Sequence, residues 1–441
     1  MAIVRNGRKS AKRTEKAPEL DIEIHGLTHE AHGVGRHEQK VVFVPGALPG
    51  ETVSTRLVKQ QRSFNQGQLI AIQQASPHRV NPTCPHFERC GACQLQHLAT
   101  SEQIKYKQDN LQQQLQRHLK LEDLPWQTPI LSEGFGYRRR ARLGVRYRKQ
   151  QDEIIIGFRE EGNSHLTAID LCPVLEPQLS ALIQPLHTAI SALANKSVIT
   201  QIELISSDQG PVVVLRHLKP LDSTDQAVLQ DMAQIQACNL YLEGNDTLEC
   251  LYPESEPVLT YTVSEMDLAF QVKDFIQGNG GVNQAMVNRA KEWLQLQPNE
   301  TLLDLFAGIG NFSLPLAKQA KTVLAVEGVG PMVERIEYNA QRHDMNNINA
   351  MALNLDDEEL LFRLPKADAI LLDPPRTGAA TLMPWLSKQT ARILYVACEP
   401  SSLVRDAQAL LDAGFRIEKI TVMDMFPQTK HVESMALFVK D

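Results

Sequence analysis

Two apolar, strand-like runs near the end of the chain lead into residues that could carry out catalysis. The run ADAILL leads into Asp373-Pro374-Pro375-Arg376, and the run TARILYV leads into Ala397-Cys398-Glu399-Pro400. A free cysteine is more often a packing residue than a catalytic group, but the carboxyl ends of strands face the crevice in which α/β folds bind ligands. The position of Cys398 therefore favours nucleophilic catalysis by its thiol.

A turn with two glycines indicates a second part of the same crevice. The run TLLDLF continues into Ala307-Gly308-Ile309-Gly310-Asn311, and Glu327 ends the next apolar run seventeen residues after Gly310. Glycine lets the backbone approach a ligand closely, and an acidic side chain at this distance can accept hydrogen bonds from ribose hydroxyl groups. Ser313 replaces the third glycine of the dinucleotide fingerprint, so the pattern disfavours a hydride-transfer enzyme.

Four of the seven cysteines are candidate metal ligands. Three are close together as Cys84-x5-Cys90-x2-Cys93, and Cys172 before Pro173 is a candidate fourth ligand. Four thiolates suit either tetrahedral zinc or an iron–sulfur cluster. Zinc is the commoner metal, but the paired Cys-x2-Cys knuckles typical of zinc sites are missing. The cysteine pattern is therefore compatible with either zinc or an iron–sulfur cluster.

The scaffold for these residues is predicted by alternating strand-like and helical runs from Phe275 to the C terminus. Such alternation is typical of βαβ units in a mainly parallel sheet with helices on both faces. The last two runs, FRIEKITVMDM and ESMALFVKD, have no helix between them. We therefore expect an α/β fold with a Rossmann-like doubly wound sheet and an antiparallel pair at one edge.

Earlier segments have different patterns. Residues 1–18 are basic and predict a disordered arm, and the short alternating runs of 19–76 predict an OB-like β-barrel. The pattern of residues 77–272 predicts a mixed, mostly β central domain. Residues 273–441 are expected to form the catalytic domain. Within the central domain, Ile104, Leu111, Leu115 and Leu119 recur at helical spacing, which predicts a helix over 101–120 that could pack on the catalytic domain.

Charge and hydropathy limit the possible partners. The 441 residues carry a formal net charge of −7, and no run reaches the roughly 18 apolar residues that a membrane span needs. We expect a cytoplasmic protein, because the cysteines are too few for a disulfide scaffold. One stretch is locally basic, since residues 137–150 hold seven Lys and Arg with two tyrosines and no acid. This composition is typical of an RNA contact, although a solvated hairpin would look similar.

The motifs DFIQGNGGVNQAM, DLFAGIGNFSLPLA, LAVEG, LLDPPR, ACEPSSL and HVES follow one another in the C-terminal part. This part resembles the S-adenosylmethionine-dependent class I methyltransferases and, more specifically, the RNA 5-methyluridine methyltransferases. The barrel segment resembles the TRAM module, an RNA-binding OB-like fold. The resemblance implies methylation of uracil C5 in 23S ribosomal RNA, with no obligate protein partner.

The resemblance also implies residue roles. Cys398 would add to uracil C6 as the nucleophile, and Glu433 would remove the C5 proton as the general base. Phe275 and Gln277 would lie beside the target base. S-adenosyl-L-methionine would be contacted by Gln277, Phe306, Asn311, Glu327, Asn354 and Asp373. Cys84, Cys90, Cys93 and Cys172 would hold a [4Fe-4S] cluster, and Cys238 and Cys250 would be packing residues.

Two alternatives remain open from the sequence. The substrate could be another 23S uridine or the transfer RNA T-loop, because the motifs do not identify the modified nucleotide. The second alternative is a protein of a different class, namely a non-catalytic RNA-binding module that retains only the methyltransferase-like fold. The intact Asp373, Cys398 and Glu433 argue against that second alternative.

Overall fold

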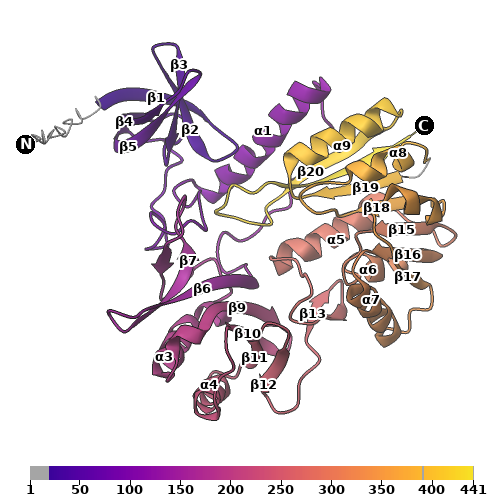
Figure 1. Cartoon of the computed structure of the whole chain (residues 1–441). Coiled ribbons are helices and arrows are strands. Elements are labelled where there is room, and N and C mark those ends of the chain that lie inside the picture. Colours follow the sequence, from indigo (N-terminus) through magenta and orange to yellow (C-terminus); the bar gives the residue numbers. More distant parts are fainter. Residues whose placement is uncertain (1–18, 390–391, 441) are drawn as a thin grey trace, which may run out of the picture. The chain divides into compact units, whose positions relative to one another are not determined.

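The computed structural model describes residues 19–389 and 392–440, so the basic arm expected over 1–18 lies outside the described residues. The chain forms two compact units, Met1–Arg79 and Val80–Asp441 (Figure 1).

The first unit is a closed five-stranded β-barrel with strand order β1-β2-β3-β5-β4. Its strands are β1 (Glu19–Leu27), β2 (His32–His37), β3 (Lys40–Pro45), β4 (Thr52–Gln60) and β5 (Phe64–Gln74). Alternate residues point inward, and Ile22, Ile24, Val42, Val44 and Val53 form most of its small core. The expected OB-like barrel is therefore confirmed.

A buried carboxylate fixes the ends of this barrel. The Glu51 side chain is fully buried and accepts hydrogen bonds from the backbone N–H groups of Leu48 (2.8 Å) and Ser76 (3.2 Å). Arg79 donates to both of its oxygens, at 2.5 and 2.9 Å. Glu51 thereby joins the segment before β4 to the segment after β5.

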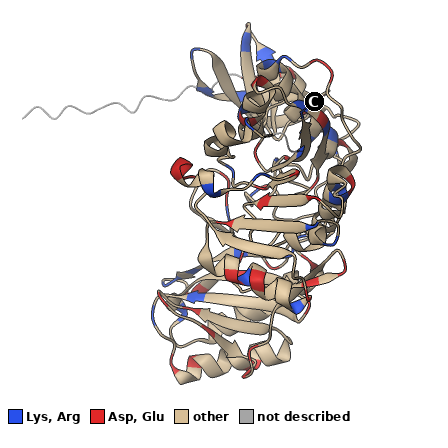
Figure 2. Ribbon diagram, turned by 90° about the vertical axis from the view of Figure 1, so that its right-hand side faces the viewer, with Lys and Arg blue, Asp and Glu red and all other residues tan. Residues whose placement is uncertain are grey.

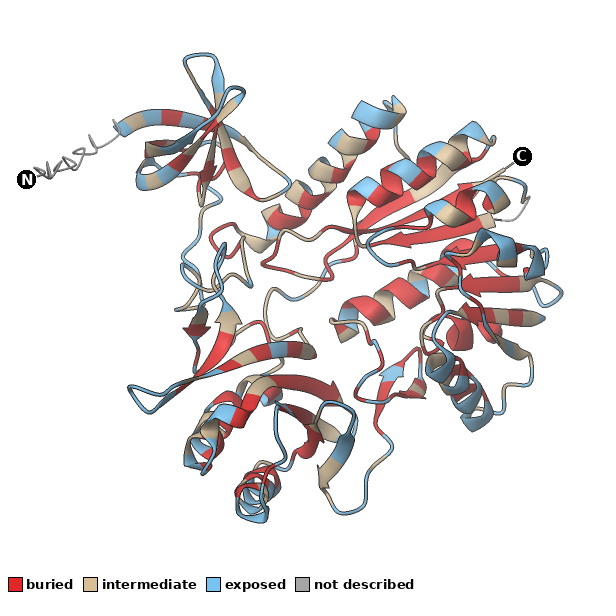
Figure 3. Cartoon of the chain, viewed as in Figure 1, coloured by how far each residue is buried: buried red, intermediate tan, exposed pale blue. Residues whose placement is uncertain are grey.

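The second unit begins with a loop that contains three cysteines and continues into helix α1 (Thr100–Leu119). Ile104, Leu111 and Leu115 are buried on one side of α1, as Figure 3 shows. This side packs against α9 (Pro400–Asp412) and β20 (Arg416–Met423) of the last sheet. The helix begins and ends one residue before the range expected from the sequence.

A mixed sheet with the strand order β12-β11-β10-β9-β6-β7-β8 forms the centre of the chain. Its strands are β6 (Arg140–Arg148), β7 (Glu153–Arg159), β8 (Leu166–Ala168), β9 (Ile199–Ser207), β10 (Gly210–His217), β11 (Asn239–Glu243) and β12 (Leu248–Tyr252). Its helices are α2 (Pro177–Ser180), α3 (Ile183–Ala192), η1 (Lys196–Val198) and α4 (Ser223–Ile235). A separate hairpin, β13 (Thr260–Val263) with β14 (Met266–Ala269), follows.

The last sheet has the order β17-β16-β15-β18-β19-β21-β20. Strands β15 to β19 are parallel, whereas β21 is antiparallel to both β19 and β20. Its remaining strands are β15 (Thr301–Leu305), β16 (Thr322–Glu327), β17 (Ile348–Ala352), β18 (Ala369–Leu372), β19 (Arg392–Ala397) and β21 (Glu433–Val439). The expected doubly wound sheet with an antiparallel edge pair is confirmed.

Short and long helices connect these strands, and the central strands are buried throughout (Figure 3). The connecting helices are α5 (Gly280–Leu294), α6 (Ser313–Ala317), α7 (Gly330–Arg342), η2 (Glu358–Arg363), η3 (Ala380–Leu382) and α8 (Met383–Leu386). Helix α5 precedes the first strand, and its N-cap is Asn279, whose side chain accepts from the Val282 N–H group.

Figure 2 shows basic and acidic residues interspersed along the ribbon. None of the helices in the described part of the chain combines the length and the apolar character that crossing a membrane requires.

The Glu51 ion pair predicts that barrel stability depends on pH. Burial alone would raise the pKa of Glu51, but the hydrogen bonds from Arg79, Leu48 and Ser76 outweigh it and hold the pKa below the ordinary 4.5. The unfolded chain therefore takes up this proton more readily. The ion pair stabilises the barrel above pH 4.5, and this stability is lost as the pH falls through the lowered pKa.

We expect Glu51→Gln to reduce barrel stability by about 2 kcal/mol at neutral pH and to weaken the acid dependence. Hydrogen exchange of β4 peptides, corrected for the intrinsic effect of pH, measures both quantities. Glu23→Gln, at an exposed position of β1, is the matched control. A Glu51→Gln barrel as stable as the control at pH 7 would contradict the assignment.

Candidate functional site

The residues singled out from the sequence gather at one edge of the last sheet. Phe306, Asp373 and Cys398 directly follow the carboxyl ends of β15, β18 and β19, and Glu327 is the last residue of β16. Asn354 comes two residues after β17. Because parallel strands end at the same edge of a sheet, these residues line the crevice where such folds bind ligands.

The antiparallel strand β21 brings its amino end to this edge. Ala397, the last residue of β19, pairs with Ser434 of β21. Cys398 therefore follows β19 at the point where Glu433 begins β21. The charges of Glu433 and Asp373 both raise the pKa of the Cys398 thiol.

Burial strongly disfavours negative charge in this part of the crevice. It raises the pKa of the Cys398 thiol to about 12, to which the Glu433 and Asp373 carboxylates contribute. Burial likewise raises the pKa of Asp373 to about 7 and that of Glu433 well above its ordinary value. Arg376 and Lys107 oppose these shifts at Glu433. The resting site thus holds a protonated thiol beside a carboxyl group that is prepared to retain a proton.

The glycine turn after β15 is shaped by left-handed backbone and by Glu327. Phe306, Gly308 and Gly310 have φ values of +64°, +60° and +93°. Glu327 accepts hydrogen bonds from the N–H groups of Gly308 and Val329, both at 3.0 Å. A Cβ on Gly310 would lie 2.3 Å from Leu314, so this turn requires glycine. The carboxylate of Glu327 therefore holds the turns after two neighbouring strands together.

A buried polar network supports the same turn. Asn311 and Asn283 of α5 exchange amide hydrogen bonds at 2.8 and 2.9 Å, and the Tyr261 hydroxyl donates to Asn311 Oδ1 at 3.0 Å. Below the turn, Ser313 donates to the buried Asp304. Burial raises the pKa of Asp304 to about 7, and the charges of Asp373 and Glu327 add to the shift. The sequence prediction did not include Tyr261 and Asn283.

Gln277 connects the segment before α5 to the acidic residue after β18. Its Nε2 donates to Asp373 Oδ2 at 3.3 Å, and its carbonyl oxygen accepts from Arg139 Nε at 2.6 Å. Arg139 is buried, and its guanidinium carbon lies 4.5 Å from the centre of the Tyr261 ring. Two residues before Gln277, Phe275 exposes 63% of its surface. An exposed aromatic ring at this crevice can stack on a planar ligand.

The turn after β18 is held by two residues of α9. The buried Asp406 accepts hydrogen bonds from the Ala379 N–H group at 2.7 Å and from the Tyr395 hydroxyl at 2.6 Å. Arg405 donates to Asp406 Oδ1 at 2.8 Å and to the Thr377 carbonyl at 2.8 Å. Since α9 begins two residues after Cys398, these bonds fix the turn that contains Arg376 relative to the helix after the thiol.

The cysteine-rich loop is bonded to the segment that contains the fourth cysteine. His86 Nε2 lies 3.0 Å from Asp170 Oδ1, and Gly91 N donates to Arg159 O at 3.0 Å. His86 and Asp170 each lie two residues from a cysteine, namely Cys84 and Cys172.

The four thiols influence one another within this arrangement. Burial raises the pKa of Cys90 to about 11 and that of Cys93 to about 12, and the charges of the neighbouring cysteines add to both shifts. In residues 19–389 and 392–440 no three His, Cys, Asp or Glu side chains are arranged to hold a single metal ion.

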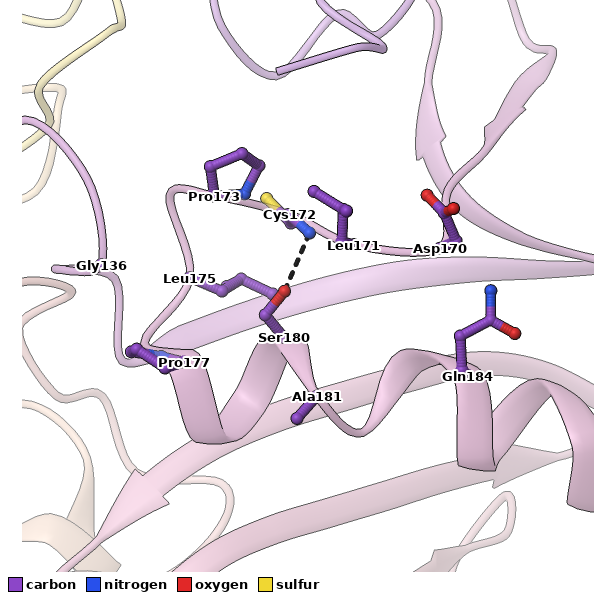
Figure 4. Close-up of a pocket in the computed structure, with 10 residues that line it drawn as sticks. All are labelled: Gly136, Asp170, Leu171, Cys172, Pro173, Leu175, Pro177, Ser180, Ala181 and Gln184. Carbon is purple, nitrogen blue, oxygen red and sulfur yellow. Dashed lines mark hydrogen bonds between the residues drawn. The ribbon is translucent and has the colours of Figure 1, made fainter. Parts of the chain in front are cut away.

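A hollow of about 430 Å³ adjoins Cys172. Figure 4 shows Cys172 between Asp170 and Leu175, with its backbone N–H group bonded to Ser180 Oγ. That bond is 2.9 Å long and anchors the cysteine to the end of α2. The cysteine thus lies at an accessible rim of the central sheet.

The basic stretch at 137–150 divides into internal and exposed cations. Arg139 is buried, and Arg140 pairs with Glu203 at 2.9 Å. The side chains that are exposed on β6 and beyond it belong to Arg142, Arg146, Arg148 and Lys149. All four have exposed side chains, as a contact with an RNA backbone requires, but Arg142 also pairs with Glu203 at 3.4 Å and Arg148 with Glu153 at 3.2 Å. Arg139 and Arg140 hold the protein together. The sequence prediction did not separate the two groups.

Comparison with known proteins gives two family matches. Residues 99–441 match the tRNA (Uracil-5-)-methyltransferase family, and residues 13–70 match the TRAM domain. The chain is 41% identical over 442 residues to the 23S rRNA (uracil(1939)-C(5))-methyltransferase RlmD of Pectobacterium atrosepticum, a match that covers 99% of this chain and 97% of the relative. It is 39% identical to the corresponding protein of Shewanella sediminis, with 96% of each chain covered.

A solved structure shares the fold. The tRNA (uracil-54, C5)-methyltransferase of Pyrococcus abyssi, in complex with S-adenosyl-L-homocysteine, superposes with a TM-score of 0.73 and 21% sequence identity. The superposition covers 95% of this chain and all of the archaeal one.

The contacts of the turn after β18 predict that Gly378 cannot be replaced. Gly378 has a φ of +75°, and a Cβ there would lie 2.5 Å from Arg405 Nη2 and 2.6 Å from Asp406 Oδ2. We expect Gly378→Ala to lower the free energy of unfolding by about 3 kcal/mol and to speed hydrogen exchange at 373–379.

Gly414→Ala is the matched control, because Gly414 also has a positive φ, +90°, but its nearest neighbour would be 3.7 Å away. The control retains only the left-handed backbone penalty of about 1–2 kcal/mol. Denaturant unfolding compares the two, and equal losses would show that crowding at Gly378 is unimportant.

Proposed function

This chain belongs to the tRNA (uracil-5-)-methyltransferase family, and we propose that it methylates C5 of a uridine in 23S ribosomal RNA through a covalent Cys398 intermediate. As a member of this family it is an S-adenosylmethionine-dependent RNA (uracil-C5)-methyltransferase. The observation that carries the proposed mechanism is the pairing of Ala397 with Ser434, which brings a thiol and a carboxyl group to one point of the crevice.

The reaction requires both groups. Uracil C5 is too weak a nucleophile to attack a sulfonium methyl group. The Cys398 thiol therefore first gives its proton to solvent, and the Sγ thiolate adds to C6, so that the electron pair of the C5–C6 double bond moves onto C5 and O4. C5 then forms a bond to the methyl carbon, whose bond to sulfur breaks, and S-adenosylhomocysteine leaves. Glu433 removes the C5 proton, the double bond returns, and the thiolate is expelled.

The electrostatics of the crevice suit this sequence of steps. A carboxylate whose pKa is raised by burial is a stronger base once it is ionised, as removal of a proton from carbon requires, and the positive charges of Lys107 and Arg376 favour that ionised form of Glu433. The thiol, however, needs activation, because its pKa of about 12 leaves it protonated at neutral pH. Arg376 lowers the pKa of Cys398, and we propose that its positive charge favours the thiolate.

The remaining residues of the edge are assigned to the methyl donor. We propose that Glu327 accepts hydrogen bonds from the donor's ribose, with Phe306, Asn311 and Asn354 around it. Gln277 and Asp373 would contact the part of the donor nearest the target base, and Phe275 would lie beside that base. Support comes from their common position at the carboxyl edge of β15 to β18 and from the glycine turn that lets a ligand approach the backbone.

The choice of 23S ribosomal RNA rests on whole-chain similarity. Relatives that share about 40% of their residues with this chain over nearly its full length are named for uracil 1939 of 23S ribosomal RNA, whereas the transfer RNA enzyme of known structure shares 21%. The exposed cations of β6 and the TRAM barrel supply surfaces for RNA. Because the target base must reach the crevice, the enzyme would turn it out of its stack.

For the cysteine site we propose a [4Fe-4S] cluster held by Cys84, Cys90, Cys93 and Cys172. The donor set fits, since the chain brings four mutually interacting thiols together through the bonds of its loop to Asp170 and Arg159. A cluster of this kind is held by thiolate ligands. It would stabilise the loop and its connection to the central sheet, while methyl transfer itself would require no electron.

The proposed function predicts that substitutions of Cys398 and Glu433 impair different steps of the reaction. With labelled donor and unmodified 23S ribosomal RNA, we expect Cys398→Ala to lose methylation and all covalent RNA adduct while still binding the donor. Glu433→Gln should form the methylated adduct but release it at least a hundredfold more slowly. Denaturing gels with labelled RNA measure the adduct. Normal turnover by Cys398→Ala would refute the covalent mechanism, and unmodified transfer RNA tests the alternative substrate.

The cluster assignment predicts the metal content of the protein. Anaerobically purified protein should contain iron and acid-labile sulfide in equal amounts, and Cys90→Ser should lose both together with the visible absorbance of the cluster. Cys238→Ser, at a buried cysteine outside the group, is the control. Zinc in a one-to-one ratio without sulfide would overturn the assignment.

A further inference from the structure

Glu433, which we assign as the general base, directly follows the connection between β20 and β21. Residues 424–432 join β20 to β21, and Met423 pairs with Glu433 in the last rung of the ladder. Both ends of the connection therefore lie beside Glu433. Any displacement of the connection moves the end of the strand on which the carboxyl group is carried.

Residues from much earlier in the chain hold this connection. Gln428 O accepts hydrogen bonds from the N–H groups of Gln94 and Leu95, both at 2.9 Å. The buried side chain of Gln103 accepts from Gln428 N at 2.8 Å and donates to Gln428 Oε1 at 2.9 Å. The Tyr137 hydroxyl donates to Pro427 O at 2.8 Å. The cysteine-rich loop and α1 thus fasten the connection at its middle.

A buried ion pair fastens its beginning. The Lys107 side chain on α1 is 0% exposed, and that of Asp424 is 2% exposed. Lys107 Nζ donates to Asp424 Oδ1 at 2.7 Å and to Phe426 O at 2.9 Å. A buried ammonium group is stable only when it is paired and hydrogen-bonded. The geometry of the pair therefore sets the path of the chain from Met423 onward.

We propose that Lys107, together with Gln103, is a positioning residue for proton abstraction: it fixes residues 424–432 and so aligns Glu433 with the C5 proton. This role rests on the proposed function of Glu433. Lys107 contacts neither the target uracil nor the methyl donor in this scheme. It acts through Asp424 and through the pairing of Met423 with Glu433 between β20 and β21.

The charge of Lys107 contributes to the same role. Burial raises the pKa of Glu433, and Asp373 and Glu399, which follow β18 and β19, raise it further. Lys107 from α1 and Arg376 from the turn after β18 oppose this. Cys398 also faces Glu433 from the end of β19, and His431 is neutral because burial lowers its pKa to about 4. Of the two cations, Lys107 is the buried one, so its position is fixed by the fold.

The test separates formation of the covalent adduct from its release. In RNA with 5-fluorouridine at the target position, fluorine replaces the C5 proton, so proton removal is blocked. Formation of the covalent adduct on this RNA therefore depends on Cys398 and on the fold, but not on the general base Glu433. We expect Lys107→Met to form this adduct as fast as the unmodified enzyme. On ordinary RNA, Lys107→Met should accumulate adduct and release product about ten- to a hundredfold more slowly. The acidic limb of its pH–rate profile should move to higher pH, because the variant lacks a positive charge that lowers the pKa of Glu433.

Three further variants distinguish positioning from stability. Lys107→Arg keeps the cation and should retain most of the release rate. Lys107→Met with Asp424→Leu removes both buried charges, which is often tolerated by the fold, and should still release slowly. Lys105→Met, at an exposed position of the same helix, is the matched control and should behave as the unmodified enzyme.

The outcomes are distinct. A stable double variant that releases product at the normal rate would overturn the positioning role, as would an unchanged pH profile with normal release in Lys107→Met. Equal slowing of adduct formation and release would assign Lys107 to general stability instead. Failure of the unmodified enzyme to form an adduct on 5-fluorouridine RNA would refute the proposed covalent mechanism, and this role with it.

Discussion

The ladder between the antiparallel strands β19 and β21 is the contact on which the functional edge depends. A purely parallel sheet presents only residues that follow carboxyl ends, whereas β21 adds its amino end at the same place. The register that pairs Ala397 with Ser434 is held by buried partners such as Ile393 with Phe438. A slip of one residue would turn Glu433 to the other face of the sheet, so packing in the middle of the strands decides which groups meet at their ends.

Burial of this edge imposes an electrostatic problem that the surrounding residues must solve. Asp304 and Asp373 both have a pKa of about 7 because burial disfavours their charged forms. On the proposed function, a cationic methyl donor in the crevice would favour ionisation of both carboxyl groups. Donor binding and the charge state of the crevice would then be coupled. Arg376 and Lys107 supply positive charge from the protein, one at the exposed turn after β18 and one from the buried interior of α1.

The local sequence was sufficient to predict those helices and strands that follow from the periodic spacing of apolar residues. The alternation of runs after Phe275 predicted the sheet and its antiparallel edge, and strand ends identified Cys398 and Asp373 as crevice residues. Contacts over long sequence separations were not accessible in this way. Lys107 pairs with a residue 317 positions later, and its one signal was a lysine within the apolar stripe of Ile104, Leu111 and Leu115. The division of the basic stretch into internal and exposed cations was likewise not accessible, because only the folded sheet brings Glu203 near Arg140 and Arg142.

These long-range contacts also bear on what constitutes the catalytic unit. The sheet and its crossing helices begin near residue 273, but the contacts of residues 424–432 come from Gln94, Gln103, Lys107 and Tyr137. The family match begins at residue 99 and therefore includes α1. A sheet separated from that helix would lose the Lys107 partner of Asp424 and the hydrogen bonds between Gln103 and Gln428. On the proposed function, the segment from the cysteine-rich loop through α1 is for this reason part of the framework that positions Glu433.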